Sequence, residues 1–201
     1  PTNAILVNPH LSKDHGEPWR FLCTAGLAFK LIHGMLKKLR QDGDKVALEL
    51  SPKESIGLSG LGTIADLVPL KNENRILANF GLKYLSQQSG IGVQALLKEA
   101  KVENTSLVGE DVAFKIAPRI NACGRLDDPD LAISLLLETD PNNCRALAKK
   151  MNEYNEERKS IESNLSEEAL NQANNLFSEK PAVVACGEGD AWNPGVVGIV
   201  A

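Results

Sequence analysis

Three stretches of the sequence hold residue types that could take part in chemistry, and the first centres on Asp66. This aspartate falls at the C-terminal end of a predicted helix, where the macrodipole disfavours a carboxylate. Its neighbours are apolar, which predicts a poorly solvated charge. A hard cation such as Mg²⁺ or Mn²⁺ would stabilise the carboxylate. The alternative is an aspartate that forms a local turn before Pro69. One carboxylate does not make a metal site, so further ligands must come from elsewhere.

The second stretch is rich in arginine. Arg119, Asn121 and Arg125 are interspersed with small residues. Guanidinium groups bind phosphate oxygens bidentately, and small neighbours let a nucleic-acid backbone come close. The pattern therefore predicts a phosphate-binding surface. In the alternative interpretation, Asp127 and Asp128 pair with Arg125 and cap the helix that follows.

The third stretch is a glycine-bearing turn at Trp192–Val200 that leads into an apolar run. Such a turn could present backbone N–H groups to an anion. We favour the simpler interpretation, a turn that enters a helix or a strand. His10, His15 and His33 lack the spacing of metal ligands, and we expect them to be non-catalytic.

The elements that must position these residues are mostly helices. Apolar residues recur every three or four positions in 19–40, and amphipathic patterns predict helices at 73–87 and 91–100. Start signals at Ser51-Pro52 and Asp128-Pro129 predict two more, at 52–65 and 129–138. Short apolar runs at 4–7, 46–50 and 182–186 predict strands. Together they predict an α/β fold with a mostly helical middle.

One predicted helix, residues 141–178, is much longer than the others. Asp140-Pro141 is a start signal, and neither glycine nor proline interrupts the helical spacing from Asn142 to Phe177. At ~1.5 Å per residue its length is roughly 55 Å. Its apolar stripe is narrow, so it is too polar to lie wholly inside one small domain. A coiled-coil arm is one interpretation. We prefer a helix that joins two domains.

Composition excludes several classes of protein. With 43% apolar and 24% charged residues, the chain of 201 residues has the mix of a soluble globular protein, not of a disordered or collagenous one. Its apolar runs are too short to span a bilayer, and its first residues lack the pattern of a signal peptide, so we expect neither. The four cysteines form no C-x-x-C pair, which argues against zinc and predicts reduced thiols. The net charge of −4 argues mildly against a large nucleic-acid footprint. Both ends lie in apolar segments, so we expect a segment of a longer protein.

Several short motifs occur in one order and at one spacing, and together they resemble the RecJ family of single-stranded-DNA-specific 5′→3′ exonucleases. This family belongs to the DHH phosphoesterase superfamily. The resemblance covers essentially the whole chain. The motifs are Val7–Pro9, Gly62–Leu70, Asn74–Leu77, Pro118–Leu126, Asn155–Arg158 and Trp192–Ala201.

The resemblance implies a domain layout. Residues 1–139 would be the mostly helical C-terminal part of a DHH-type catalytic domain, and residues 140–178 the interdomain helix. Residues 179–201 would begin a second α/β domain, the DHH-associated domain. The family's Asp-rich and Asp-His-His motifs lie upstream of this segment, and its Gly-Ser-rich motif lies downstream.

The resemblance also implies residue roles. Asp66 matches a metal-ligating aspartate of a centre that holds two Mn²⁺ or Mg²⁺ ions, with most ligands outside this chain. Arg119, Asn121 and Arg125 match the run that lines the nucleic-acid cleft and meets phosphate. Where the family usually has Trp-His-Pro-Gly, this chain has Asn193 in place of histidine.

The implied activity is metal-dependent hydrolysis of single-stranded DNA in DNA repair and recombination, by a cytoplasmic and monomeric enzyme. Single-stranded-DNA-binding protein and a helicase are its implied partners, with no membrane contact. We expect the isolated segment to be inactive. The alternatives are a nanoRNA or cyclic-dinucleotide phosphodiesterase of the same superfamily and a non-catalytic replication scaffold. The long helix argues against the former, and the retention of Asp66 argues against the latter.

Overall fold

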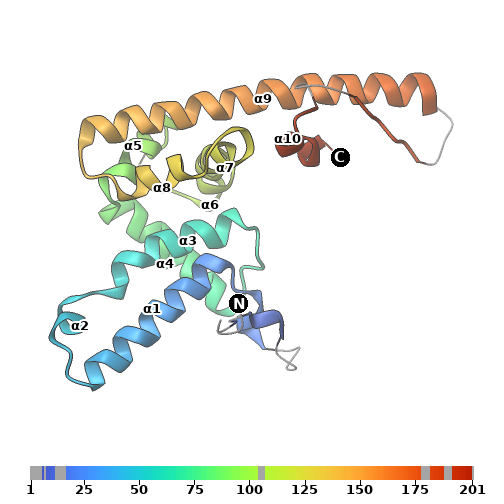
Figure 1. The fold of residues 1–201 in the computed structure, drawn as a ribbon. Coiled ribbons are helices and arrows are strands. Elements are labelled where there is room, and N and C mark those ends of the chain that lie inside the picture. Colours follow the sequence, from blue (N-terminus) through green and yellow to red (C-terminus); the bar gives the residue numbers. More distant parts are fainter. Residues whose placement is uncertain are drawn as a thin grey trace. The chain divides into compact units, whose positions relative to one another are not determined.

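The structure is a computed structural model that describes residues 6, 8–11, 17–103, 107–177, 182–187 and 192–200. The chain divides into two compact units, the first made of Pro1–Ser89 with Val102–Ala117 and the second of Gly90–Lys101 with Pro118–Ala201. Every regular element in the described part is helical (Figure 1). None of the described helices is both long enough and apolar enough to span a membrane.

Three helices form the frame of the first unit, namely α1 (Thr24–Gln41), α3 (Ile56–Ala65) and α4 (Asn72–Gln88). The apolar helix α3 lies in contact with both α1 and α4. Its buried side chains Leu61 and Ile64 form part of the core. The shorter elements of this unit are η1 (Pro9–Leu11), η2 (Pro18–Phe21), α2 (Lys45–Glu49), η3 (Pro52–Ser55), α6 (Gly109–Asp111) and the π-helix η5 (Val112–Ile116).

The contact between α3 and α4 depends on two glycines. A Cβ atom added to Gly60 would lie 2.6 Å from the Cα atom of Gly81 and 2.8 Å from the Leu77 carbonyl oxygen. A Cβ added to Gly81 would lie 2.5 Å from the Cα of Gly60. Real Cβ atoms do not come this close to backbone, so the two helices cross at a distance that only glycine permits.

The second unit is built along one long helix. It contains α5 (Ile91–Glu99), α7 (Ala117–Leu126), α8 (Asp130–Leu137), α9 (Pro141–Phe177) and α10 (Pro194–Val200). Helices α5, α8 and α10 all contact α9. One face of α9 is buried by them, along the row Cys144, Ala148, Met151, Asn155 and Leu165.

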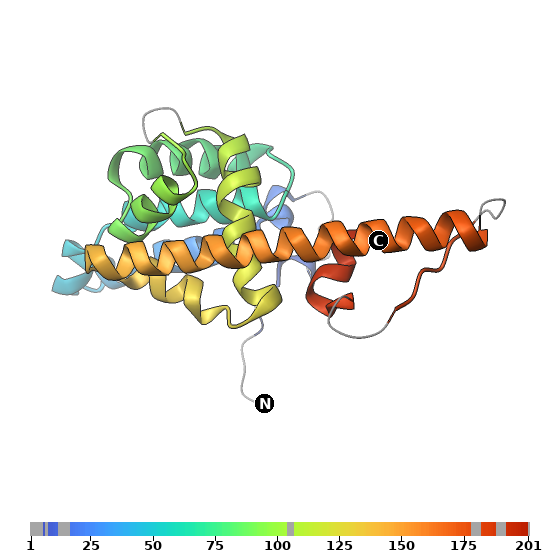
Figure 2. The same ribbon diagram turned by 90° about the horizontal axis from the view of Figure 1, so that it is seen from above.

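The prediction of a single long helix is confirmed. Helix α9 runs without interruption for 37 residues (Figure 2). Its start is capped as the sequence predicts, because Asp140 Oδ1 accepts hydrogen bonds from the backbone N–H groups of Asn142 and Asn143, both at 2.9 Å. That α9 joins two domains, and that the domain boundaries fall at residues 139 and 178, stay predictions.

The predicted strands are not found in the described residues. Residues 46–50 lie mainly in helix α2, whose start is capped by the Asp44 side chain, which accepts a hydrogen bond from the Ala47 N–H at 2.8 Å. Residues 182–186 have no regular structure, and the side chain of Gln172 bonds both backbone groups of Cys186 in place of a neighbouring strand. The strand predicted at 4–7 lies, except for Leu6, outside the described residues. The α/β class is therefore not confirmed.

The glycine contact in the first unit gives a test of this packing. Gly60→Ala should destabilise the chain by about 1–3 kcal/mol, because the added methyl group overpacks the helix crossing and outweighs the gain in helix propensity. Gly34→Ala is the matched control, since Gly34 lies inside α1 with no atom within 4 Å of an added Cβ. That change should stabilise the chain by up to about 1 kcal/mol. Urea unfolding of both variants measures the difference, and equal effects would refute the close crossing.

Candidate functional site

Asp66 lies at the C-terminal end of α3, as the sequence predicts. Its backbone N–H donates to the Gly62 carbonyl at 3.0 Å, and the next residue, Leu67, has a positive φ of 53° that turns the chain out of the helix. The side chain of Asp66 is exposed, and no hydrogen bond or ion pair joins it to another described residue. The expectation of a poorly solvated charge is therefore wrong: this carboxylate faces water and is available to a ligand.

The surroundings of Asp66 are held by buried contacts. Gly62 lies against α1, where an added Cβ would be 2.5 Å from the Ala25 Cβ, so the glycine makes room for the neighbouring helix. Asn74 is buried, and its Nδ2 donates to the carbonyls of Phe21 at 2.8 Å and Pro69 at 3.1 Å. Asn74 thus anchors the turn that follows Asp66. Asn74 begins one of the family motifs in the sequence, but that motif did not predict that the side chain anchors this turn.

The described residues do not form a metal centre by themselves. They contain no group of three or more histidine, cysteine, aspartate or glutamate side chains placed to hold an ion. Asp66 offers oxygen atoms of the kind that Mg²⁺ and Mn²⁺ prefer, and this is one donor where such ions need several. That the remaining ligands come from elsewhere stays a prediction.

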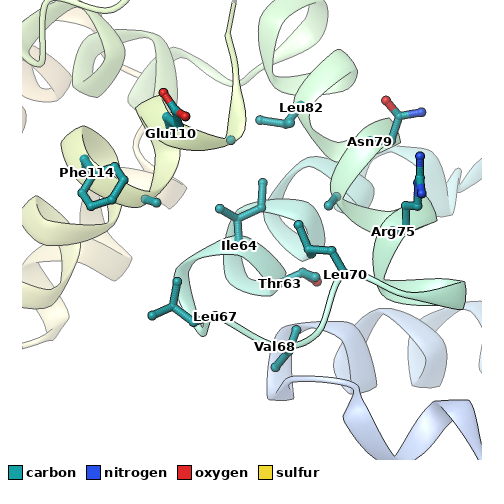
Figure 3. A pocket seen from close by; sticks show the side chains of 13 residues that line it. Thr63, Ile64, Leu67, Val68, Leu70, Arg75, Asn79, Leu82, Glu110 and Phe114 are labelled. Carbon is teal, nitrogen blue, oxygen red and sulfur yellow. The ribbon is translucent and has the colours of Figure 1, made fainter.

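An apolar pocket of about 530 Å³ lies beside the Asp66 turn (Figure 3). Ile64, Leu67 and Val68 line one side of it, and Phe114 of the π-helix η5 lines another. Its polar rim includes Arg75, Asn79 and Glu110. No spacing in the sequence predicts this pocket, because its walls come from segments that lie far apart along the chain.

The three predicted phosphate-binding residues all lie on α7, and α7 presents them on two different faces. Asn121 and Arg125 are exposed and line one shallow groove together with Gly124 and Ile133. The Nε of Arg119 instead donates to the Asn152 side chain of α9 at 3.0 Å. Asp66 lies in the first unit, and these residues lie in the second.

Arg119 is the partly buried member of this set. Burial lowers the pKa of its guanidinium, while the nearby carboxylates of Glu156 and Glu99 act in the opposite direction. An arginine remains protonated under all ordinary conditions, so this pKa shift reports its surroundings and not a change of charge. The contacts of Arg119 join α7 to the middle of α9.

Arg125 does not form the predicted pair with the aspartates that follow it. The Tyr154 hydroxyl donates to Asp127, and Asp128 Oδ1 accepts from the Asp130 N–H at 2.9 Å. The Asp128 hydrogen bond forms a local turn directly before α8, whose N-cap residue Pro129 has no side-chain cap, so the capping part of the alternative interpretation is not confirmed. The ion pair with Arg125 is not formed among the described residues either. Arg125 Nη1 donates instead to the Gly195 carbonyl, at 2.6 Å.

The third motif is a helix start, as the favoured interpretation predicts. Pro194 opens α10, and the Asn193 side-chain oxygen accepts from the Gly195 N–H at 2.8 Å. The backbone carbonyl of Asn193 accepts from Val196 at 2.9 Å. Since the Gly195 amide is occupied by its own cap, this turn does not present that amide to an anion. Asn193 is thus an N-cap residue.

The sequence was compared with family models and with curated proteins, and the relatives found all carry the same name. No family model matches. Curated relatives are the single-stranded-DNA-specific exonucleases RecJ of Bacillus subtilis, 37% identical over 203 residues, of Haemophilus influenzae, 38% over 206, and of Escherichia coli, 34% over 208. Each match covers 100% of this chain but only 24%, 35% and 36% of the relative. The chain therefore spans from 24% to 36% of their length.

Solved structures agree with the sequence matches. The crystal structure of RecJ from Thermus thermophilus in complex with Mn²⁺ matches with a TM-score of 0.78 and 33% identity, over 96% of this chain and 27% of that one. A crystal structure of exonuclease RecJ bound to manganese matches with a TM-score of 0.78 and 34% identity, over 96% of this chain and 45% of that one. The resemblance predicted from the motifs is confirmed.

The role of Asn193 as an N-cap can be tested directly. Asn193→Ala should accelerate amide hydrogen exchange at Gly195 and Val196, because loss of the cap costs a helix start about 1 kcal/mol. Asn193→Ser should keep most of the protection, since a hydroxyl oxygen also caps well. Amide hydrogen exchange of both variants can be measured by NMR or mass spectrometry. If the alanine and serine variants exchange alike, the side chain does not cap α10.

Proposed function

Because the chain is similar over its whole length to one segment of RecJ, we propose that it is part of a nuclease that hydrolyses phosphodiester bonds of single-stranded DNA from the 5′ end. The observation that carries this proposal is the match, over the whole of this chain, to a part of relatives that are named as exonucleases. The proposal extends to divalent metal dependence, supported by the manganese and magnesium complexes of similar structures. It also includes a monomeric, cytoplasmic enzyme of DNA repair and recombination, with single-stranded-DNA-binding protein and a helicase as partners.

In this proposal Asp66 contributes one ligand to the metal centre. Its exposure and its lack of a partner among the described residues support such a role, because the carboxylate need not break an existing interaction to bind an ion. Bound Mn²⁺ or Mg²⁺ would supply an activated water and neutralise charge on the phosphodiester. The part of the chain itself is to hold the carboxylate at a fixed turn, through Gly62 and the Asn74 anchor. Alone, the chain is expected to be inactive.

We assign phosphate binding to the groove face of α7. Arg125 has the charge and the planar donors that suit phosphate oxygens, and Asn121 adds a neutral donor four residues away on the same face. Arg119 belongs to the proposal through the resemblance, although its Nε is engaged with Asn152. Each relative reported is a RecJ exonuclease, so no observation favours another DHH phosphodiesterase or a scaffold.

The role of Asp66 is tested in the full-length protein. Asp66→Ala should lower Mn²⁺-dependent release of nucleotides from single-stranded DNA by at least about a hundredfold, because loss of one preorganised charge at a reacting centre has effects of this size. Asp42→Ala is the matched control. Asp42 also ends a helix, with the same backbone angles (φ −83°, ψ 1°) as Asp66, and its carboxylate pairs with Lys38.

The control variant should keep normal turnover, and both variants should unfold at nearly the temperature of the parent. If Asp66→Ala retains near-normal kcat at saturating Mn²⁺, then Asp66 is only a turn residue. A metal role would then have to be withdrawn, while the match to RecJ would be unaffected.

The role of Arg125 is tested by binding at several salt concentrations. Arg125→Ala should weaken single-stranded DNA binding by about tenfold, the size expected for one charge-assisted contact. It should also lower the slope of log K against log salt by roughly 0.7, the value for one phosphate on a single strand. Arg125→Lys should restore the slope better than the affinity, because lysine keeps the charge and loses the bidentate donors.

Arg145→Ala serves as the control, since Arg145 is an exposed arginine on α9 that donates to Asn142 at 3.2 Å. It should leave both the affinity and the slope unchanged. An unchanged slope in Arg125→Ala together with a lower unfolding temperature would make Arg125 a structural residue.

A further inference from the structure

Arg125 and Gly195, 70 positions apart in the sequence, meet where α10 begins. Arg125 Nη1 donates a hydrogen bond of 2.6 Å to the Gly195 carbonyl oxygen. The two backbones also touch: a Cβ atom added to Gly195 would lie 2.3 Å from the Arg125 carbonyl oxygen and 3.0 Å from its carbonyl carbon. Only glycine permits this approach, since a side chain at 195 would meet rigid backbone.

The Gly195 carbonyl is itself held in place by three features. Asn193 caps the first turn of α10 through the Gly195 N–H at 2.8 Å. Pro194 restricts the backbone at the first helical position. The next residue, Val196, is fully buried, and α10 contacts α9. The carbonyl that receives the Arg125 hydrogen bond therefore belongs to a rigid part of the unit.

Arg125, in contrast, is an exposed side chain with many rotamers. It forms no ion pair with a described carboxylate, and the Gly195 carbonyl takes one of its donor groups. A guanidinium carries five N–H donors, so a hydrogen bond on one side leaves donors for a phosphate. Fixing a flexible side chain before the ligand arrives reduces the entropy lost on binding.

We propose that Gly195 is a positioning residue for Arg125: its carbonyl, presented by the capped start of α10, orients the guanidinium toward the groove that takes a nucleic-acid phosphate. The inference rests on the phosphate role proposed for Arg125. The inference explains why position 195 requires a glycine and why α10 packs against the end of α7. It also gives residues 192–196 an indirect role in phosphate binding, through the position of Arg125.

The test compares two glycines of the same helix in the full-length protein. Gly195→Ala should drive the segment away from Arg125, whereas Gly198→Ala is a matched control because no atom lies within 4 Å of its added Cβ. Binding of a single-stranded oligothymidylate is measured at several salt concentrations. Gly195→Ala should weaken binding by about tenfold and lower the salt slope by roughly 0.7, as expected for loss of one phosphate contact. Gly198→Ala should change neither.

The double variant separates positioning from a general loss of structure. If Gly195 acts through Arg125, the pair Gly195→Ala and Arg125→Ala should bind no more weakly than Arg125→Ala alone, because the two changes remove one shared interaction. Additive losses, or a Gly195→Ala protein with an unchanged salt slope, would overturn the inference. In either case Arg125→Ala alone still reports on the proposed function. An Arg125→Ala protein with unchanged affinity and slope would overturn both.

A second variant covers the case in which Gly195→Ala does not fold. Val196→Ala removes buried methyl groups that hold α10 and adds no clash. It should accelerate hydrogen exchange in α10 and lower the salt slope in the same direction as Arg125→Ala. Faster exchange with an unchanged slope would show that the docking of α10 does not orient Arg125.

Discussion

The second unit depends on one buried row of a helix that is otherwise polar. This row consists of Cys144, Ala148, Met151, Asn155 and Leu165, and helices α5, α8 and α10 all contact α9. The outer faces of α9 carry charged residues that pair along the helix, such as Lys159 with Glu156. Because a narrow stripe buries little apolar area per turn, the neighbours of α9 must be placed by specific contacts as well as by hydrophobic burial.

Those specific contacts separate the two faces of α7. One face is tied to α9 by the Arg119–Asn152 hydrogen bond and, just past the end of the helix, by Tyr154 and Asp127. Burial raises the pKa of the Cys123 thiol on this helix, so the residue stays a neutral packing group. With this face fixed, Asn121 and Arg125 are left on another, open face. The structural arginine and the proposed binding arginine therefore differ in role because they point in different directions from the same helix.

The sequence predicted the helices with long apolar periodicity and the capped start of α9, because those signals are local. The strand predictions were wrong where they depended on short apolar runs, because such runs do not distinguish a strand from a helix or a loop. Residues 46–50 lie mainly in a helix that the Asp44 side chain caps, and residues 182–186 have no regular structure. The positions of Asp66 and Arg125 were predicted, but not their environments. Exposure of the Asp66 carboxylate depends on the turn at Leu67, and the partner of Arg125 lies 70 residues away. Neither of these two features can be predicted from the spacing of residues in the sequence.

Asn193 stands where the resemblance implies a histidine, and its side chain has a structural role at the start of α10. Asparagine is among the strongest N-cap residues, and here its side chain caps the first turn of a helix of seven residues. Pro194 occupies the first position of that helix. A short helix gains little from its own hydrogen bonds, so the cap and the buried Val196 must hold it. The backbone contact at Gly195 then fixes where that helix can sit. The Asn193 cap and the docking of α10 thus give this motif a structural role.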